Sequence, residues 1–494
     1  ALSAEDTGSR NVAIGQDALA SLNFNGNGYN VAIGYEAGVR VSTGVENILI
    51  GGLAGDHLTT GSYNIAIGKD ALSAEDAHGK NIAIGWGTLA ALNAGSDAYN
   101  IAIGHNSGHY LTTGTGNILI GGLAGDALTT GSSNTVLGYD ALSTEDAHGT
   151  NTAIGYQSLK AQNAGADGYN VAVGFQSGVA VTTGVQNTII GSLAGDALTE
   201  GGENTALGYF ALSGETKGDR NVALGAYTLF NQNNTTNANA YNTAVGYNAG
   251  FATTTAIQNT LIGGLAGDAL TTGSNNIAIG VLALSAEDTG GKNIAIGFQS
   301  LAAQNYNGDA FNVAIGYQAG STVTTGVENI LIGGNAGDAL TSGNYNIAIG
   351  RNALSAEDAH GRNVAIGHSA LAAQDAGADA YNVAVGFWAG LSLTTGVYNV
   401  LLGATAGDAI TTAEKNIAIG YGALGSEDTH GRNIAIGDSA LTTLNAGAYG
   451  YNTAVGFEAG NAMTTAIENT LVGAFAGDAL TTGVQNVAVG AGAL

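Results

Sequence analysis

Short apolar segments recur along the whole chain, and each one follows an asparagine. The motif is Asn, then three residues that are apolar or Thr, then Gly, as in Asn11–Gly15 and Asn30–Gly34. Successive asparagines lie 19, 17, 17 and 17 residues apart, and this order repeats to Asn486 with one longer step of 21 residues after Asn221. Four units, which we call a, b, c and d, therefore form a super-repeat of 70 residues, or 72 where the longer step occurs.

The length and composition of a unit predict one coil of a β-solenoid. Segments such as Asn-Ile-Ala-Ile-Gly have strand composition, and each Gly in a helix would destabilise it by roughly 1 kcal/mol. Helical repeats also have longer periods, of about 33 to 47 residues. The sequence therefore predicts an all-β fold, a parallel β-solenoid (β-roll) of 28 coils of 17–19 residues. We expect one continuous array from residue 1 to residue 494, part of a longer fibre, with super-repeats that start at residues 11, 81, 151, 221, 293, 363 and 433.

Alternation along an extended segment separates two sets of side chains. We number positions from the asparagine; +1 and +3 are mostly Val, Ile or Leu, and we expect them to face the interior of each coil. Position +2 should then face outward, yet it is always Ala, Leu, Ile or Val. Its bulkiest residues fall in unit c and form the predicted lateral packing stripe: Leu49, Leu119, Ile189, Leu261, Leu331, Leu401 and Leu471. An outward apolar stripe favours lateral association of parallel solenoids, most simply a homotrimer, and the alternative is that the stripe lies inside a wide coil of a single chain.

The asparagine is the most regular feature of the unit. Asn tolerates the left-handed backbone of a corner, and in coils stacked at about 4.8 Å its amide can bond to the amides one coil above and one below. We expect such a ladder in every coil, starting with Asn11, Asn30, Asn47, Asn64, Asn81 and Asn100. A role as a turn residue alone would also admit Asp, Ser or Gly, and none of these replaces it.

Composition narrows the classes of function. With 38 acidic and 12 basic residues the net charge is −26, which gives no cationic surface for nucleic acid or for an anionic membrane surface. No apolar run approaches the length of about 18 residues that a membrane helix needs, so we expect no membrane insertion in this segment. The chain has no Cys, which excludes disulfides and thiolate chemistry.

Candidate chemistry is sparse. The eight histidines show no recurring pattern that would indicate a catalytic triad or a metal site, so we expect neither catalysis nor a metal or other cofactor. The Glu-Asp pairs of unit d, such as Glu75 with Asp76, could collect cations or could form a solvated acidic rib. A recurring Asp in unit c, such as Asp56, is expected at a corner, about 19 Å from the next one.

Unit a has the longest turn, and an aromatic residue always precedes the asparagine that follows it. These rib aromatics are Tyr29, Tyr99, Tyr169, Tyr241, Phe311, Tyr381 and Tyr451. They could stack on the rings of a cell-surface glycan, although a role in fixing the turn or a subunit contact explains them as well. Ice binding would need Thr in register on successive coils, and the Thr-Thr pairs of units b and c are interrupted by units d and a.

Units such as Asn-Thr-Ala-Ile-Gly-Tyr-Gln at 151–157 and Asn-Val-Ala-Ile-Gly-Tyr-Gln-Ala-Gly at 312–320 resemble the repeats of bacteriophage tail-fibre shafts. They are more distantly similar to the β-roll heads of trimeric autotransporter adhesins, whose units are shorter. The resemblance covers essentially the whole chain, and it implies a trimer of β-solenoids in a stiff fibre, extracellular or on a virion surface, that carries or contacts a receptor-binding tip. The leading hypothesis is a non-enzymatic fibre shaft for host or surface attachment. The alternative is an adhesin that binds glycans along its ribs, and an ice-binding solenoid comes third.

Overall fold

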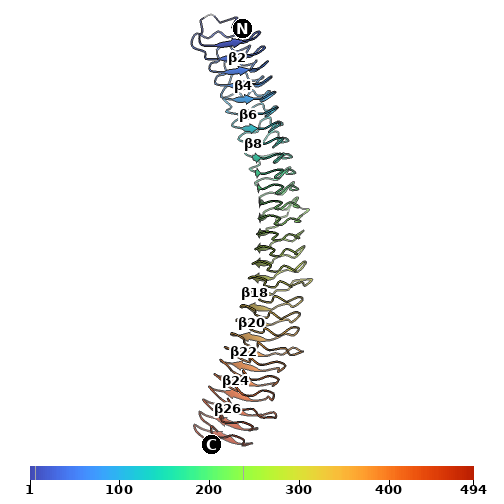
Figure 1. Cartoon of the computed structure of the whole chain (residues 1–494), viewed down its shortest axis with the longest axis vertical. Coiled ribbons are helices and arrows are strands. Elements are labelled where there is room, and N and C mark those ends of the chain that lie inside the picture. The colour runs from blue at the N-terminus through green and yellow to red at the C-terminus, as the bar shows by residue number, and fades with distance from the viewer. Residues whose placement is uncertain (6, 237) are drawn as a thin grey trace. The chain divides into compact units, whose positions relative to one another are not determined.

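The chain folds into a stack of short strands joined by turns. The computed structural model describes residues 1–5, 7–236 and 238–494, and in these ranges every strand has three residues and there is no helix. Each strand occupies positions +1 to +3 of one unit, so the 28 units form about 28 turns of a parallel β-solenoid with about 17 residues per turn (Figure 1). The predicted fold class is confirmed.

The solenoid divides into two compact units, residues 1–248 and 249–494. The strands of the first are β1 (Val12–Ile14), β2 (Val31–Ile33), β3 (Ile48–Ile50), β4 (Ile65–Ile67), β5 (Ile82–Ile84), β6 (Ile101–Ile103), β7 (Ile118–Ile120), β8 (Thr135–Leu137), β9 (Thr152–Ile154), β10 (Val171–Val173), β11 (Thr188–Ile190), β12 (Thr205–Leu207), β13 (Val222–Leu224) and β14 (Thr243–Val245). The strands of the second are β15 (Thr260–Ile262), β16 (Ile277–Ile279), β17 (Ile294–Ile296), β18 (Val313–Ile315), β19 (Ile330–Ile332), β20 (Ile347–Ile349), β21 (Val364–Ile366), β22 (Val383–Val385), β23 (Val400–Leu402), β24 (Ile417–Ile419), β25 (Ile434–Ile436), β26 (Thr453–Val455), β27 (Thr470–Val472) and β28 (Val487–Val489).

Within each compact unit, a strand pairs in parallel with the strand of the next turn. β1 and β2 align Val12 with Val31, and β15 and β16 align Thr260 with Ile277, so equivalent positions are stacked. A residue type that recurs in every turn therefore forms a column parallel to the stack. The core and the surface of the solenoid therefore consist of such columns, one for each position of the repeat.

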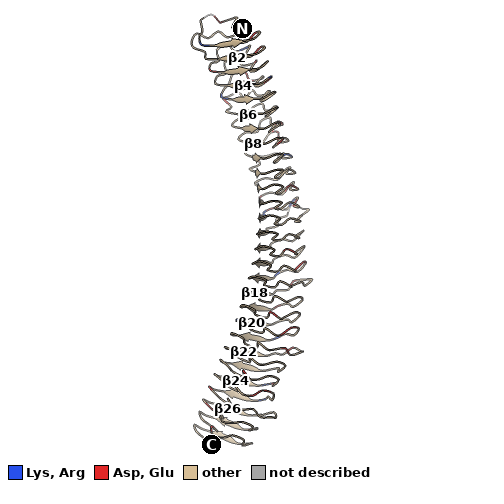
Figure 2. Ribbon diagram, in the orientation of Figure 1, with Lys and Arg blue, Asp and Glu red and all other residues tan. Residues whose placement is uncertain are grey.

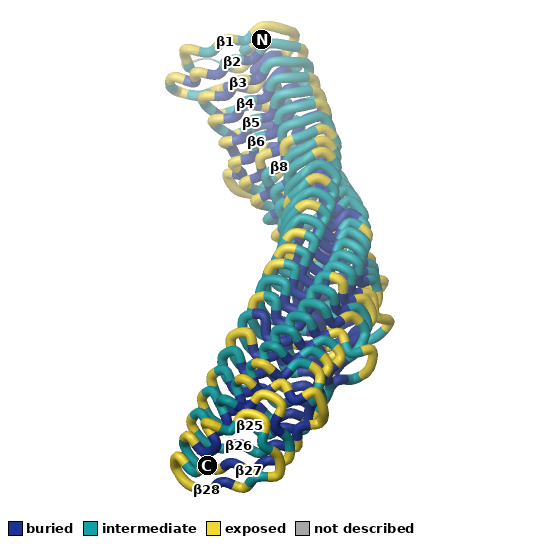
Figure 3. Tube along the Cα trace, turned by 60° about the horizontal axis from the view of Figure 1, so that its bottom comes forward, coloured by how far each residue is buried: buried dark blue, intermediate teal, exposed yellow. Residues whose placement is uncertain are grey.

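The two faces of the strands are the reverse of the prediction. Position +2 is buried, since Ala32 and Leu49 are fully shielded from solvent, whereas Ile48 at +1 is 36% exposed (Figure 3). The predicted lateral packing stripe thus lies in the chain's own core, as the alternative interpretation had it, and every member is fully buried: Leu49, Leu119, Ile189, Leu261, Leu331, Leu401 and Leu471. The reason is the period of two along a strand. Because Asn47 at position 0 is buried, position +2 points inward with it, and positions +1 and +3 point outward.

Size complementarity inside the core explains the large residue of unit c. Position +8 is Leu in units a and d, with Gly in units b and c. A Cβ on Gly38 would lie 2.5 Å from Cδ1 of Leu49, and a Cβ on Gly55 would lie 2.8 Å from its Cδ2. The large residue of unit c therefore fills the space that two glycines leave, and the core stays close-packed from turn to turn.

The glycine at +4 permits a close approach between turns. Gly51 has a φ of 136°, and a Cβ on it would lie 2.4 Å from the carbonyl oxygen of Gly68 in the next turn. The obstructing atom belongs to the backbone, which cannot move without breaking the strand pairing. The corner that follows each strand is therefore restricted to glycine.

Candidate functional site

The buried asparagines form a hydrogen-bonded column. The backbone N–H and the side-chain amide of Asn47 both donate to Oδ1 of Asn30, over 2.9 and 3.1 Å, and the same amide donates to the carbonyl oxygen of Gly61 at 2.9 Å. Oδ1 of Asn47 in turn accepts the backbone N–H of Asn64 at 2.9 Å. Each turn therefore satisfies the polar groups of the next one.

The six asparagines singled out from the sequence all lie in this column. Asn30, Asn47, Asn64, Asn81 and Asn100 are fully buried, and Asn11, in the first turn, is partly exposed. Each of the five buried residues donates its backbone N–H to Oδ1 of the asparagine one turn earlier, over 2.9–3.1 Å. Because these groups bond to one another, the column has a structural role and offers no site for a ligand.

The outer side of the sheet has Val, Ile or Leu at position +3 in every turn and Val, Ile or Thr at position +1. The strands contain only Val, Ile, Leu, Ala and Thr, and charged residues lie outside them (Figure 2). The outward side chains are only partly covered, since Ile48, Ile118 and Ile330 at +1 of unit c are 36%, 39% and 37% exposed. We call the outward residues at +1 and +3 the sheet face. It forms an apolar strip along each compact unit.

The rib aromatics lie next to the sheet face, one position before the asparagine of unit b. All seven are exposed, by 43% to 59%: Tyr29, Tyr99, Tyr169, Tyr241, Phe311, Tyr381 and Tyr451. Six of them carry a basic side chain from the previous turn over the ring: Arg10, Lys80, Arg220, Lys292, Arg362 and Arg432. Lys80 Nζ, for example, lies 5.0 Å from the ring centre of Tyr99 and 2.7 Å from Oδ2 of Asp97. These contacts occupy one face of the ring and help to hold the rib in place.

Two open hollows combine a rib aromatic with the sheet face. Phe311, Val313, Glu328 and Ile330 line a hollow of about 440 Å³, and Tyr29, Val31, Glu46 and Ile48 line a hollow of about 530 Å³. Each offers a ring for stacking, a carboxylate for hydrogen bonds and two aliphatic side chains. In the super-repeat of Tyr169 the position of the glutamate is taken by Gln186, so the chemistry of this surface varies along the chain.

Unit d places a glutamate in the core. Position +11 is Leu58 in unit c and Glu75 in the following unit d, and both side chains are fully buried. The core glutamates of the six complete d units, all fully buried, are Glu75, Glu145, Glu215, Glu287, Glu357 and Glu427. A solvated acidic rib is therefore wrong for these residues, although the neighbouring Asp76 is exposed.

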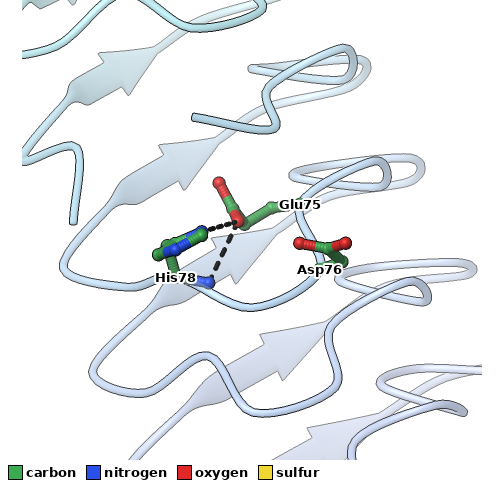
Figure 4. A group of neighbouring side chains, drawn as sticks. All are labelled: Glu75, Asp76 and His78. Atoms are coloured by element: carbon green, nitrogen blue, oxygen red, sulfur yellow. Dashed lines mark hydrogen bonds and ion pairs between the residues drawn. The ribbon is translucent and has the colours of Figure 1, made fainter. Parts of the chain in front are cut away.

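In four super-repeats a histidine stands three residues after the core glutamate. The groups are Glu75, Asp76 and His78; Glu145, Asp146 and His148; Glu357, Asp358 and His360; and Glu427, Asp428 and His430, each with one possible ligand atom per residue within 4.8 Å of the others. In the first group, Oε1 of Glu75 accepts the backbone N–H of His78 at 3.1 Å and faces Nδ1 of the same histidine at 3.5 Å (Figure 4). That Nδ1 is buried and has no hydrogen-bond partner in the described part of the chain.

Glycine replaces this histidine in other super-repeats, and the turn then closes on the carboxylate. The backbone N–H of Gly290 donates to Oε1 of Glu287 at 2.7 Å. A Cβ on Gly290 would lie 2.6 Å from that oxygen and 2.5 Å from the carbonyl oxygen of Tyr306, so a side chain has no room. Super-repeats with histidine and those with glycine at this position therefore surround the buried glutamate with different turns.

The carboxylate of Glu215 accepts hydrogen bonds at both of its oxygens. Its Oε1 accepts the backbone N–H groups of Thr216, Lys217 and Gly218 over 2.9, 3.1 and 2.8 Å. Its Oε2 accepts the side-chain amides of Gln232 and Asn234 over 2.9 and 3.0 Å. Both oxygens of this buried carboxylate are thereby satisfied by neutral donors.

Burial raises the pKa of several core glutamates, because the charged form loses its hydration. The pKa of Glu357 and that of Glu427 rise to about 7, and the backbone N–H groups of His360 and His430 offset the effect of burial only in part. The pKa values of Glu145 and Glu287 shift in the same direction, again mainly through burial. The surroundings of these carboxylates therefore compensate only in part for the hydration that the charged form loses.

The expectation that the histidines follow no pattern missed the Glu-Asp-x-His groups. His57, His105 and His109 do stand at other positions of the repeat, but His78, His148, His360 and His430 all stand at +14 of unit d. Aligning the super-repeats on their asparagines would have revealed the motif. The same alignment would have revealed the basic residue that precedes the asparagine of unit a in six super-repeats.

The fold and these surfaces define a repeat protein of the β-solenoid class. No protein-family model matches the chain, and no curated protein matches it significantly. Among the residues that the structure describes, none form a helix that is long and apolar enough to cross a bilayer.

Proposed function

We propose that the chain is the shaft of a non-enzymatic structural fibre, in which copies associate side by side through the sheet face, most simply as a trimer. The shaft provides reach and rigidity for attachment to a host or to another surface. The resemblance of the repeats to phage tail-fibre shafts and adhesin heads supports a place on a virion or at the outside of a cell.

The observation that carries this proposal is the partly exposed sheet face. Soluble monomers rarely expose contiguous apolar patches of more than a few hundred Å², and here outward Val, Ile and Leu recur in every turn of each compact unit. Burying this strip contributes roughly 25 cal/mol per Å², a small amount per turn that accumulates along the stack. The contact therefore involves the outward positions +1 and +3, and not the buried residues at +2.

A second copy of the chain is the partner that fits best. It has the same repeat length, so its outward side chains match those of the first copy over many turns, which a partner without this period cannot do. The net charge of −26 would repel another copy elsewhere on the surface, but the strands that form the sheet face carry no charge. Charge and period together favour self-association along this strip.

The core suits a shaft because its main contacts repeat from turn to turn. The asparagine column and the glycine corners link each turn to the next, so stability comes from interactions between neighbouring turns. Such a stack holds its length without disulfides, and the chain has no Cys.

The mass of the native particle tests the self-association. Light scattering coupled to size exclusion should give three times the chain mass of 48.7 kDa, and electron micrographs should show filaments of uniform width. A monodisperse particle of 48.7 kDa would remove the proposal.

A triple variant tests the surface involved. Ile48→Lys, Ile118→Lys and Ile330→Lys place charges on the sheet face and should reduce the particle to a monomer with an unchanged β circular-dichroism spectrum. The matched control places lysines at exposed turn positions, Thr43→Lys, Thr113→Lys and Thr325→Lys, and should keep the native mass. Dissociation of the control alone would assign the contact to the turns instead.

The hollow at Phe311 favours a second candidate function, the binding of glycans along the ribs. An exposed ring beside a carboxylate can stack on a sugar and accept its hydroxyl hydrogens, and Phe311 lies next to Glu328 in this way. A glycan array should then give signals that Phe311→Ala weakens. Tyr169→Ala, in a super-repeat with Gln186 in place of the glutamate, is the control. An array without signal would leave only the shaft.

A further inference from the structure

We propose that three Glu-Asp-Ala-His clusters of unit d each bind one divalent transition-metal ion of the zinc class. The clusters are Glu75, Asp76 and His78; Glu145, Asp146 and His148; and Glu357, Asp358 and His360. This inference goes beyond the shaft function and does not depend on it.

The spacing of the glutamate and the histidine fits a shared metal ion. Oε1 and Nδ1 lie 3.5, 3.5 and 3.6 Å apart in the three clusters. Two ligand atoms of a tetrahedral zinc ion, each at about 2.0–2.1 Å from the metal, are about 3.4 Å apart. The observed separation is too long for a good hydrogen bond between the two groups, yet close to that of two ligands on one ion.

Unpaired atoms point to a missing ligand at each cluster. Nδ1 of His78, His148 and His360 is buried and has no hydrogen-bond partner within residues 1–5, 7–236 and 238–494. The carboxylates beside two of these rings are also incompletely satisfied: Oε1 of Glu145 and of Glu357 faces Nδ1, while Oε2 of each has no hydrogen-bond partner among the described residues although both side chains are fully buried. Buried polar groups are normally satisfied, so an unsatisfied imidazole nitrogen beside a buried carboxylate with one unsatisfied oxygen calls for a further partner at the cluster. A dication would satisfy both and balance the buried negative charge.

The position of the cluster allows an ion to enter. The side chains of His78, His148 and His360 are 29%, 29% and 31% exposed, and the glutamates behind them are fully buried. The aspartate supplies a third group within 4.8 Å, and water can complete the coordination. An imidazole nitrogen among the ligands favours zinc over calcium or magnesium, which prefer oxygen ligands alone.

Other super-repeats supply natural contrasts. Where glycine replaces the histidine, the N–H of Gly290 takes up Oε1 of Glu287 at 2.7 Å and no imidazole is present. In the fourth cluster, Thr429 replaces the alanine, and its hydroxyl lies 3.0 Å from Nδ1 of His430. The ligand atom that is unpaired in the other three clusters is engaged there, so the proposal is restricted to three sites.

The test is zinc binding by the whole chain, measured by equilibrium dialysis with metal quantification and by calorimetry. The variant is His78→Gly, His148→Gly and His360→Gly combined, because glycine is the native residue at this position in the super-repeat of Gly290. The wild type should bind three more zinc ions per chain than this variant, and zinc should raise the thermal unfolding midpoint of the wild type alone. Cobalt(II) should give visible absorption bands of a low-coordinate site in the wild type that the variant lacks.

A second triple variant controls for exposed imidazoles. His57→Asn, His105→Asn and His368→Asn remove three histidines outside the clusters and should leave the zinc stoichiometry unchanged. If the wild type and the His→Gly variant bind the same number of ions, or if neither binds zinc, the glutamate and histidine form an ion pair only and the proposal is wrong.

Discussion

The core of the solenoid contains a column of buried asparagines and a column with buried glutamates, and the two are satisfied in different ways. Asparagine occurs in every turn, so the residue above and the residue below supply its hydrogen bonds, as Asn30 and Asn64 do for Asn47. Glutamate occurs in one turn of four, and no glutamate lies in the next turn. Its partners come from its own turn and the next one, and they range from six donors around Glu215 to an oxygen of Glu357 with no hydrogen-bond partner in the described part of the chain.

The difference shows what repetition does for a buried polar group. A group that repeats with the period of the stack finds partners in the neighbouring turns, because every turn offers the same donor and acceptor at the same place. A group with a longer period depends on the turn sequence around it, and that sequence changes from one super-repeat to the next. Among the described residues, Oε2 of Glu145 and of Glu357 lacks a hydrogen-bond partner in the glutamate column, and in the asparagine column the same is true of Nδ2 of Asn293 alone.

The largest effect is expected from a change in the asparagine column. The amide of Asn329 donates to the carbonyl oxygen of Gly343 at 2.8 Å and to Oδ1 of Asn312 at 3.2 Å. Asn329→Asp removes both donors and buries a charge beside two acceptors, which should destabilise the fold by on the order of 3 kcal/mol or more near pH 7. Urea unfolding followed by circular dichroism measures the loss.

The matched control for this change lies at the end of the same column. Asn486 is partly exposed in the last turn, so Asn486→Asp should lower stability by less than about 1 kcal/mol. An equal loss at both positions would mean that burial in the column contributes nothing.

A smaller effect should distinguish two glutamates. Glu215→Leu leaves several buried N–H groups without an acceptor and should destabilise the fold by about 2 kcal/mol. Glu357→Leu should stay within about 1 kcal/mol of the wild type in the presence of a chelator, because Leu340 already fills the same core position one turn earlier. Hydrogen exchange around each site reports the local stability, and similar losses at both would contradict the contrast drawn above.

The glutamate column should also confer a pH dependence, and Glu287 is the best place to see it. Burial raises the pKa of Glu287 above its ordinary value of 4.5, so the folded chain holds this proton more tightly than the unfolded chain. The favourable contribution of the protonated form is present below pH 4.5 and is lost as the pH rises through the raised pKa. Glu287→Gln should therefore gain stability relative to the wild type as the pH rises through this window. A difference that does not change with pH would exclude the effect.

The smallest effect is expected at the surface. Lys80 contacts Asp97 and Tyr99, but all three side chains are exposed, and water replaces what is lost when one of them is removed. Lys80→Met should leave the unfolding midpoint unchanged within error in 0.5 M salt. A clear shift would show that the rib contacts contribute to stability as the buried columns do.

Much of the fold could be predicted because the repeat is visible in the sequence. The period, the number of turns and the strand positions follow from the spacing of Asn and Gly, and the structure has a strand at every predicted place. The prediction that positions +1 and +3 point inward was wrong, because it placed the larger apolar residues in the interior. Ile48 and Ile50 are larger than most residues at +2, but the narrow interior admits mainly Ala, and the burial of Asn47 fixes which alternate positions point inward.

The candidate sites were predictable to different degrees. The exposure of Tyr29 and of the other rib aromatics agrees with a place on the surface, since their position before the asparagine of unit b puts them in a turn. The burial of Glu75 could not be foreseen, because a charged residue next to Asp76 in a turn-rich segment is normally solvated. It becomes apparent only when position +11 is known to point inward, which depends on the course of the backbone between the strand and that position.

The packing of Leu49 against Gly38 and Gly55 determines by how many coils the solenoid can become longer or shorter. Loss of unit c alone, which contains Leu49, would open a void beside Gly38. Loss of unit b alone, which contains Gly38, would bring Leu49 against Leu19 of unit a. Duplication or deletion of all four coils together leaves every large side chain opposite its small partner. The stack can therefore be lengthened or shortened in whole super-repeats of 70 residues without disturbing this packing, whereas the gain or loss of a single coil would disturb it.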